Sequence, residues 1–206
     1  MSKPRPGIRH RKKLATRDRI LDAATKLLAR HGYAALRVAA VAKAAGVSPG
    51  GHLHHFQTKD ALVVAVLERI SERALKKAEE DAARIDSCDN PLAVIAGSAM
   101  AFYRSTEFLI YLDIHLSARR ETRIGAKAVE ILVEQRQAIE GMWLPHLLTR
   151  GLSRAQAQNV IRTLWSLARG LAISSAPQAD ADETDVMEFV RELLAQALPE
   201  CTCSYP

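Results

Sequence analysis

Apolar residues recur along this chain at spacings of three and four, which is the period of an amphipathic helix. The first run, Ile20 to Leu28, forms one helical stripe and stops at Gly32. Similar runs predict helices over residues 58–84, 91–115 (with a break near Ser105–Thr106), 122–148, 153–173 and 182–198. With two shorter helices before residue 58, we expect an all-α chain of about nine helices.

The stretch from Ala39 to Lys59 predicts a helix, a tight turn and a second helix. Small apolar residues through Ala45 suit close helix packing, and Gly46 stands where a helix ends in a left-handed residue. Ser48 is a good N-cap, and Pro49 follows at the first helical position. These are the parts of a helix-turn-helix, whose second helix lies in the DNA major groove.

The charge of the chain is divided unevenly along its length. Residues 1–60 carry a net charge of +10 and residues 61–206 a net charge of −4, which together give the overall +6. We expect residues 1–13 to form a basic flexible arm that tracks the phosphate backbone or enters the minor groove. A solubilising tail is the alternative, but the turn motif directly behind the arm favours nucleic-acid binding.

A spaced set of residues makes the helix-turn-helix prediction more specific. It comprises Gly32-Tyr33 and Ala35, Val38 with Val41-Ala42, Ala44 through Ser48 with Gly50, His55-Phe56, Lys59 and Leu62. This set resembles the N-terminal domain of TetR-family transcriptional regulators and covers about the first third of the chain. The resemblance implies a three-helix DNA-binding domain over residues 14–58 and a helical effector-binding and dimerisation domain over residues 59–206.

The expected DNA contacts follow from the second helix of the motif. Backbone N–H groups at its start suit phosphate, and His54 can read base edges. His55 and Lys59 match positions that resemble the family's phosphate contacts, whereas Leu53 replaces a usual tyrosine and Arg37 a usual helix cap. The predicted DNA-binding residues are Arg11, Lys12, Lys13, Arg37, Ser48, Gly50, Gly51, Leu53, His54, His55 and Lys59.

The histidines of this segment admit other interpretations. His52 stands where an apolar residue of the family packs inward, so it is either a buried, hydrogen-bonded side chain or faces the groove; we favour burial. A metal site is disfavoured, because His52, His54 and His55 cannot converge on one ion from one helix and no carboxylate or cysteine lies close in sequence. We predict no metal and no cofactor.

The second part of the chain offers a candidate effector pocket. Aromatic rings and a few polar groups in a helical bundle suit a small molecule, although the same residues can simply be core. The candidates are Phe102, Tyr103, Tyr111, His115, Trp143 and His146.

The last two helices are either ordinary core helices or, as the resemblance implies, the dimer interface, where they pair with their mates in a four-helix bundle. The candidates are Leu164, Leu167, Ala168, Leu171, Val186, Phe189, Val190 and Leu193.

Other function classes are poorly supported by the sequence. It contains no nucleophile elbow, phosphate loop or metal signature, so we do not expect an enzyme. No apolar run is long enough to span a bilayer, and three cysteines without a ligand pattern favour a reduced, cytoplasmic location. We predict a dimeric repressor released from a palindromic DNA operator by a small-molecule effector; the alternative is a ligand-independent architectural DNA-binding protein.

Overall fold

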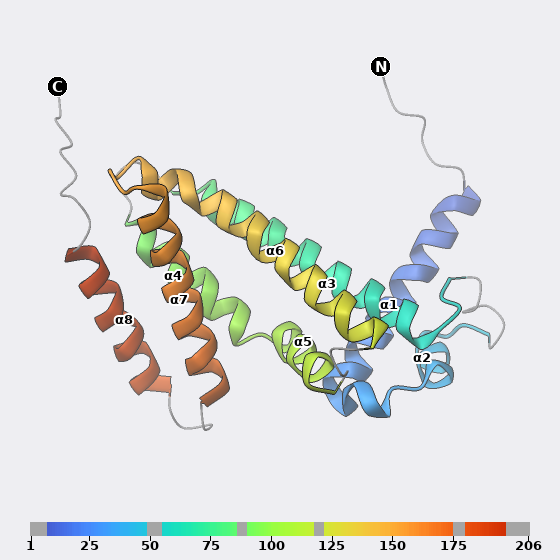
Figure 1. Cartoon of the computed structure of the whole chain (residues 1–206). Helices are drawn as coiled ribbons and strands as arrows, with labels where there is room; N and C mark the ends of the chain where they lie inside the picture. Colours follow the sequence, from blue (N-terminus) through green and yellow to red (C-terminus); the bar gives the residue numbers. More distant parts are fainter. Residues whose placement is uncertain (1–7, 49–54, 86–89, 118–121, 175–179, 197–206) are drawn as a thin grey trace, which may run out of the picture. The chain divides into compact units, whose positions relative to one another are not determined.

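The computed structural model describes residues 8–48, 55–85, 90–117, 122–174 and 180–196. Every regular element within these ranges is an α-helix, which confirms the all-α class (Figure 1). The ninth helix that we expected would follow Ser48 and lies in the undescribed residues 49–54. The eight described helices are α1 (Ile8–Ala35), α2 (Val38–Ala44), α3 (Lys59–Ala82), α4 (Pro91–Tyr103), α5 (Thr106–Ser117), α6 (Arg123–Leu148), α7 (Arg154–Ser174) and α8 (Asp180–Gln196).

The start of α1 differs from the prediction. The helix begins at Ile8, so residues 8–13 are helical and the predicted flexible arm over residues 1–13 is wrong from residue 8 onward. A threonine shortly before an apolar run is a common N-cap signal, but Thr16 lies inside the helix and donates its hydroxyl to the carbonyl of Lys12 at 2.9 Å. A threonine can make this bond to the residue four positions earlier without ending the helix.

The other end of α1 is where the sequence indicated. Gly32 has φ 74° and ψ 170°, which interrupts the helical backbone although the last turn continues to Ala35. A Cβ at this position would lie 3.2 Å from a carboxylate oxygen of Asp113, so both the backbone angle and the close approach require glycine here.

The turn after α2 is a Schellman motif, as the glycine at position 46 suggested. Gly46 has φ 63° and donates its N–H to Lys43 O at 3.2 Å, and Val47 donates to Ala42 O at 3.0 Å. These two bonds satisfy carbonyls that the helix end would otherwise leave free. At the start of α2, Arg37 makes no side-chain cap, in line with the missing Ser or Thr there.

Local caps also set the starts of the later helices. Thr58 Oγ1 accepts from the N–H of Ala61 at 3.0 Å, and Asn90 Oδ1 accepts from Leu92 at 3.0 Å. Ser153 and Gln156 cap α7 reciprocally, since each side chain accepts a hydrogen bond from the other residue's backbone N–H. The predicted helix starts near Thr58, Asn90 and Ser153 are confirmed.

The chain divides into two compact units. Unit 1 contains the chain up to Ser71 with Leu109–Ile131, and unit 2 contains Glu72–Phe108 with the chain from Leu132 onward. In unit 2, α4, α7 and α8 pack against one another (Figure 1). These contact-based units are distinct from the predicted functional domains over residues 14–58 and 59–206, which stay predictions.

The turn can be tested through its glycine. No heavy atom would lie within 4 Å of a Cβ at Gly46, so its positive φ is the only obstacle to a side chain. We expect Gly46→Ala to lower the free energy of unfolding by about 1–2 kcal/mol and Gly46→Asn to cost less, because asparagine tolerates left-handed backbone.

The matched control for this pair is Gly141→Ala in α6, where the added methyl also meets open space. It should stabilise by roughly 0.5–1 kcal/mol, because alanine is the better helix former. Denaturant unfolding measures all three variants, and equal effects of the two alanines would contradict the assigned turn.

Candidate nucleic-acid interface

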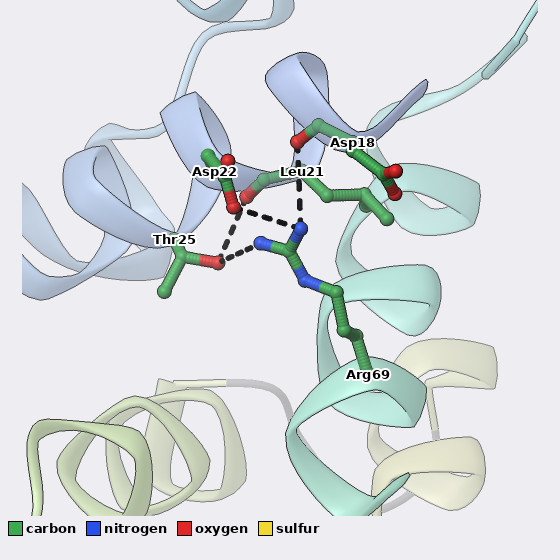
Figure 2. A network of polar contacts seen from close by, with 5 residues as sticks. All are labelled: Asp18, Leu21, Asp22, Thr25 and Arg69. Carbon is green, nitrogen blue, oxygen red and sulfur yellow. Dashed lines mark hydrogen bonds and ion pairs between the residues drawn. The ribbon is translucent and has the colours of Figure 1, made fainter. Parts of the chain in front are cut away.

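The helices of unit 1 are joined by an arginine of α3 that reaches across to α1. Figure 2 shows the Arg69 guanidinium among Asp18, Asp22 and Thr25. It forms an ion pair with Asp22 at 2.9 Å and donates to Thr25 Oγ1 at 3.2 Å and to Asp18 O at 3.4 Å. The planar fork of arginine donates in several directions at once, so this one side chain fixes the rotation of α1 against α3.

The chain reversal after α1 is held from two sides. The N–H of Tyr33 donates to Asp113 Oδ2 at 2.6 Å, and Lys59 Nζ donates to Tyr33 O at 2.6 Å. The Lys59 ammonium also lies 4.1 Å from the centre of the Tyr33 ring, a cation–π contact. Residues from α3 and α5 thereby fix the peptide that leads into α2.

Two cations meet at the start of α2. Arg37 is exposed, and its guanidinium donates to Ala34 O at 2.9 Å and Leu36 O at 3.2 Å, which holds it at the helix end. Burial and then the charge of Arg37 lower the pKa of Lys59, while Asp60 opposes them. Among the described residues, neither cation forms an ion pair with a carboxylate. Positive charge at this place is therefore available to an anion.

A basic residue of α1 packs on the described residues that precede α3. Arg17 sits 5.6 Å from the centre of the Phe56 ring, and Phe56 is buried. The predicted contacts Arg11, Lys12 and Lys13 are all exposed on α1. The start of α1 thus carries a row of exposed cations.

The remaining predicted DNA contacts are only partly described. Ser48 is exposed at the end of the turn, and His55 is half-buried and interacts with another residue. Gly50, Gly51, Leu53 and His54, together with the ambiguous His52, lie outside the described residues. Over the part of the chain that the structure describes, no cluster of His, Cys, Asp or Glu suits a metal ion.

The candidate effector residues fall into both units. Tyr111 and His115 belong to unit 1, where buried Tyr111 donates its hydroxyl to Leu67 O at 3.0 Å. Phe102, Tyr103, Trp143 and His146 belong to unit 2. Tyr103 packs edge-on against Phe108 with 4.9 Å between ring centres, and Phe102 lies 5.4 Å from Tyr103. Trp143 is buried, and His146 is half-buried.

The candidate dimer residues divide by exposure. Leu164 and Ala168 are buried within unit 2, and Leu167, Leu171 and Val190 are half-buried. Phe189 of α8 is 60% exposed, Leu193 is 48% and Val186 is 43%. Among these candidates, the large apolar side chains that are exposed to solvent belong to α8, whereas Leu164 and Ala168 lie in the protomer's own core.

Sequence reasoning missed three residues that shape this region. Asp113 is 80 positions from Tyr33, and Arg69 is 44 positions from Thr25, so no local pattern indicates either contact. Arg17 was one cation among many in a basic stretch. Its contact with the Phe56 ring depends on how α1 packs, and the pattern of charges along the sequence does not reveal that packing.

Comparisons with known proteins agree with this geometry. A sequence profile for "Bacterial regulatory proteins, tetR family" matches residues 20–66. The chain is 31% identical over 188 residues to the HTH-type transcriptional regulator CymR of Pseudomonas putida, covering 89% of this chain and 93% of that one. It is 38% identical over 65 residues to the regulator UidR of Escherichia coli, about a third of each chain (32% and 33%).

Solved structures share the fold. A TetR-family regulator from Mesorhizobium loti superposes with a TM-score of 0.74 at 18% identity, over 91% of this chain and 98% of that one. FadR from Bacillus subtilis, solved in complex with stearoyl-CoA, superposes with a TM-score of 0.63 at 21% identity, over 86% and 96%. No helix among the described residues is both long and apolar enough to cross a bilayer.

The Arg69 cluster makes a testable contribution to the stability of this region. Arg69→Lys keeps the charge but cannot reach Asp22, Thr25 and the Asp18 carbonyl together, so we expect a loss of about 1–3 kcal/mol in unfolding free energy. The control is Arg191→Lys, at an exposed pair with Glu188 whose atoms lie 2.7 Å apart, where a change below about 0.5 kcal/mol is expected. Equal losses in the two variants would show that the fork geometry at Arg69 is unimportant.

Proposed function

This chain belongs to the TetR family of bacterial transcriptional regulators, and on that premise we propose that it is a dimeric repressor whose palindromic operator is released when a small molecule binds. In this proposal, residues 14–58 bind DNA, helped by the basic residues before them. Residues 59–206 bind the effector and the second copy. The matched relatives CymR and UidR are named as transcriptional regulators, and we propose the same non-catalytic role here.

The observation that carries the DNA-binding proposal is the pair of cations at the start of α2. Arg37 and Lys59 repel each other, and no carboxylate pairs with either among the described residues. A phosphate between them removes this repulsion and gains charge-assisted hydrogen bonds. The Schellman turn at Gly46 then directs the chain into the segment proposed to read bases.

The exposed face of α8 supports a second copy as partner. Phe189 and Leu193 lie four positions apart on one side of the helix, and both are about half exposed or more (60% and 48%). Apolar side chains grouped on one helix face mark an interaction surface more often than isolated ones do. A two-fold axis that pairs α7 and α8 with their mates buries this face in a four-helix bundle.

The effector is proposed to act through geometry. Two recognition helices reach successive major grooves when they lie about one DNA turn apart, roughly 34 Å. A molecule that binds better to a different separation lowers the affinity for DNA by linkage. FadR, a neighbour in fold, was solved in complex with stearoyl-CoA, which supports the proposal that this chain also responds to a small molecule.

The test is selection of bound sequences from random duplex DNA with the full-length protein. We expect one strongly enriched inverted repeat, bound by two chains. An architectural DNA-binding protein would instead enrich no sequence and would show uniform affinity with a steep salt dependence. That second outcome would overturn the repressor proposal.

Arg37→Ala should weaken binding to every duplex alike and reduce the slope of log affinity against log salt by about one unit, because one phosphate contact is lost. The control, Lys76→Ala, removes an exposed lysine of α3 outside unit 1 and should leave binding unchanged. The measurement is the affinity of each variant for duplex DNA over a series of salt concentrations. A changed sequence preference in Arg37→Ala would mean that Arg37 reads bases rather than phosphate.

Phe189→Glu should give a folded monomer with much weaker operator binding, since a charge on the proposed interface cannot be buried without a partner. Leu116→Glu is the matched control, because Leu116 is 74% exposed on α5 and is not in the proposed interface. Light scattering and circular dichroism follow mass and folding. A dimeric Phe189→Glu protein would contradict the interface, and an unfolded one would place Phe189 in the protomer core.

A further inference from the structure

Unit 2 contains two arginines that form no ion pair with a described carboxylate. Arg136 of α6 lies 5.7 Å from the centre of the Trp165 ring, and Arg169 of α7 lies 5.7 Å from the centre of the Tyr103 ring. Both are half-buried. Across the described parts of unit 2, neither guanidinium lies within ion-pair distance of a carboxylate.

The carboxylate one helical turn after Arg136 is already occupied. Glu140 lies one turn beyond Arg136 on α6, and its two oxygens accept from Arg162 at 2.9 and 3.1 Å and from Gln158 at 2.7 Å. Burial raises the pKa of Glu140, but the hydrogen bonds from Arg162 and Gln158 and the charges of Arg162 and Arg136 lower it by more. The net effect is a lowered pKa, so the carboxylate is ionised. Its charge is shared chiefly with Arg162, which leaves Arg136 and Arg169 in excess.

The two arginines act on the same buried hydroxyl. Burial raises the pKa of Tyr103, and the charges of Arg169 and Arg136 partly oppose this effect. Tyr103 is 6% exposed and belongs to the aromatic group with Phe102 and Phe108. Cationic groups therefore border an apolar aromatic surface in the interior of unit 2.

We propose that the effector is an organic anion with an apolar body, held by the guanidinium groups of Arg136 and Arg169 beside Tyr103. The apolar body packs on Phe102, Tyr103 and Phe108. This inference rests on the proposed function and specifies its ligand. A cation is disfavoured because it would meet two unmatched positive charges. A neutral ligand would leave those charges uncompensated in a partly desolvated site.

Calorimetric titration of the full-length protein without DNA tests the ligand class. The probes are 3-phenylpropanoate and octanoate, each compared with its neutral amide, which has nearly the same shape. We expect each acid to bind at least about tenfold more tightly than its amide, the effect of one charge-assisted hydrogen bond. Equal binding of acid and amide, or no binding of any probe at millimolar concentration, would overturn the proposal.

Variants locate the site. Arg136→Gln and Arg169→Gln should each remove most of the preference for the acid while leaving amide binding within about twofold. Arg169→Lys keeps the charge and should retain part of the preference. The control is Arg154→Gln, an exposed arginine at the start of α7, which should behave as wild type. Retention of the full preference in both glutamine variants would overturn the assignment.

Operator selection is independent of these titrations: an operator found without a preference for acids would refute the ligand class and leave the DNA-binding proposal standing.

Discussion

The backbone at Gly32 and Tyr33 is the point on which the geometry of unit 1 depends. Asp113 of α5 accepts the N–H of Tyr33, and Lys59 at the start of α3 donates to its carbonyl. Both bonds are possible because Gly32 takes φ 74° and has no Cβ, which would lie 3.2 Å from Asp113. Three segments distant in sequence thereby fix the direction in which the chain enters α2. The turn at Gly46 and the cations beside it take their positions from that constraint.

The presence or absence of a carboxylate partner separates arginines that stabilise the fold from arginines that are candidates for ligand binding. Arg69, Arg84 and Arg162 each meet a carboxylate and join helices or helix turns. Arg37, Arg136 and Arg169 meet none among the described residues, although their side chains are held in place by carbonyls or aromatic rings. A positioned cation without a counter-ion is prepared for an external anion. The same physical argument therefore supports DNA phosphate at the start of α2 and a ligand anion in unit 2.

Much of the fold could be predicted because its signals are local. Apolar spacing located the helices after Thr58, and Gly46, Thr58 and Asn90 marked helix ends that hydrogen bonds confirm. Gly32 interrupts α1 through its backbone angles, although the helix continues to Ala35. The start of α1 could not be predicted in this way, because a threonine such as Thr16 can cap a helix or lie inside one, and the sequence looks the same in both cases. The candidate site depends on tertiary contacts of Asp113, Arg69 and Arg169, which no spacing pattern contains. The effector candidates were therefore chosen by residue type, and they fall into both units.

The central claim is that two copies present their turns to successive major grooves of one operator. A spin label on Lys43→Cys measures this most directly, after the three native cysteines are replaced by serine, because Lys43 is exposed in the last turn of α2 and is not a proposed DNA contact. In the complex with the selected duplex, we predict one narrow distance between the two labels near one DNA turn, about 34 Å. The absence of any distance between copies, or a broad distribution unchanged by the duplex, would contradict the account.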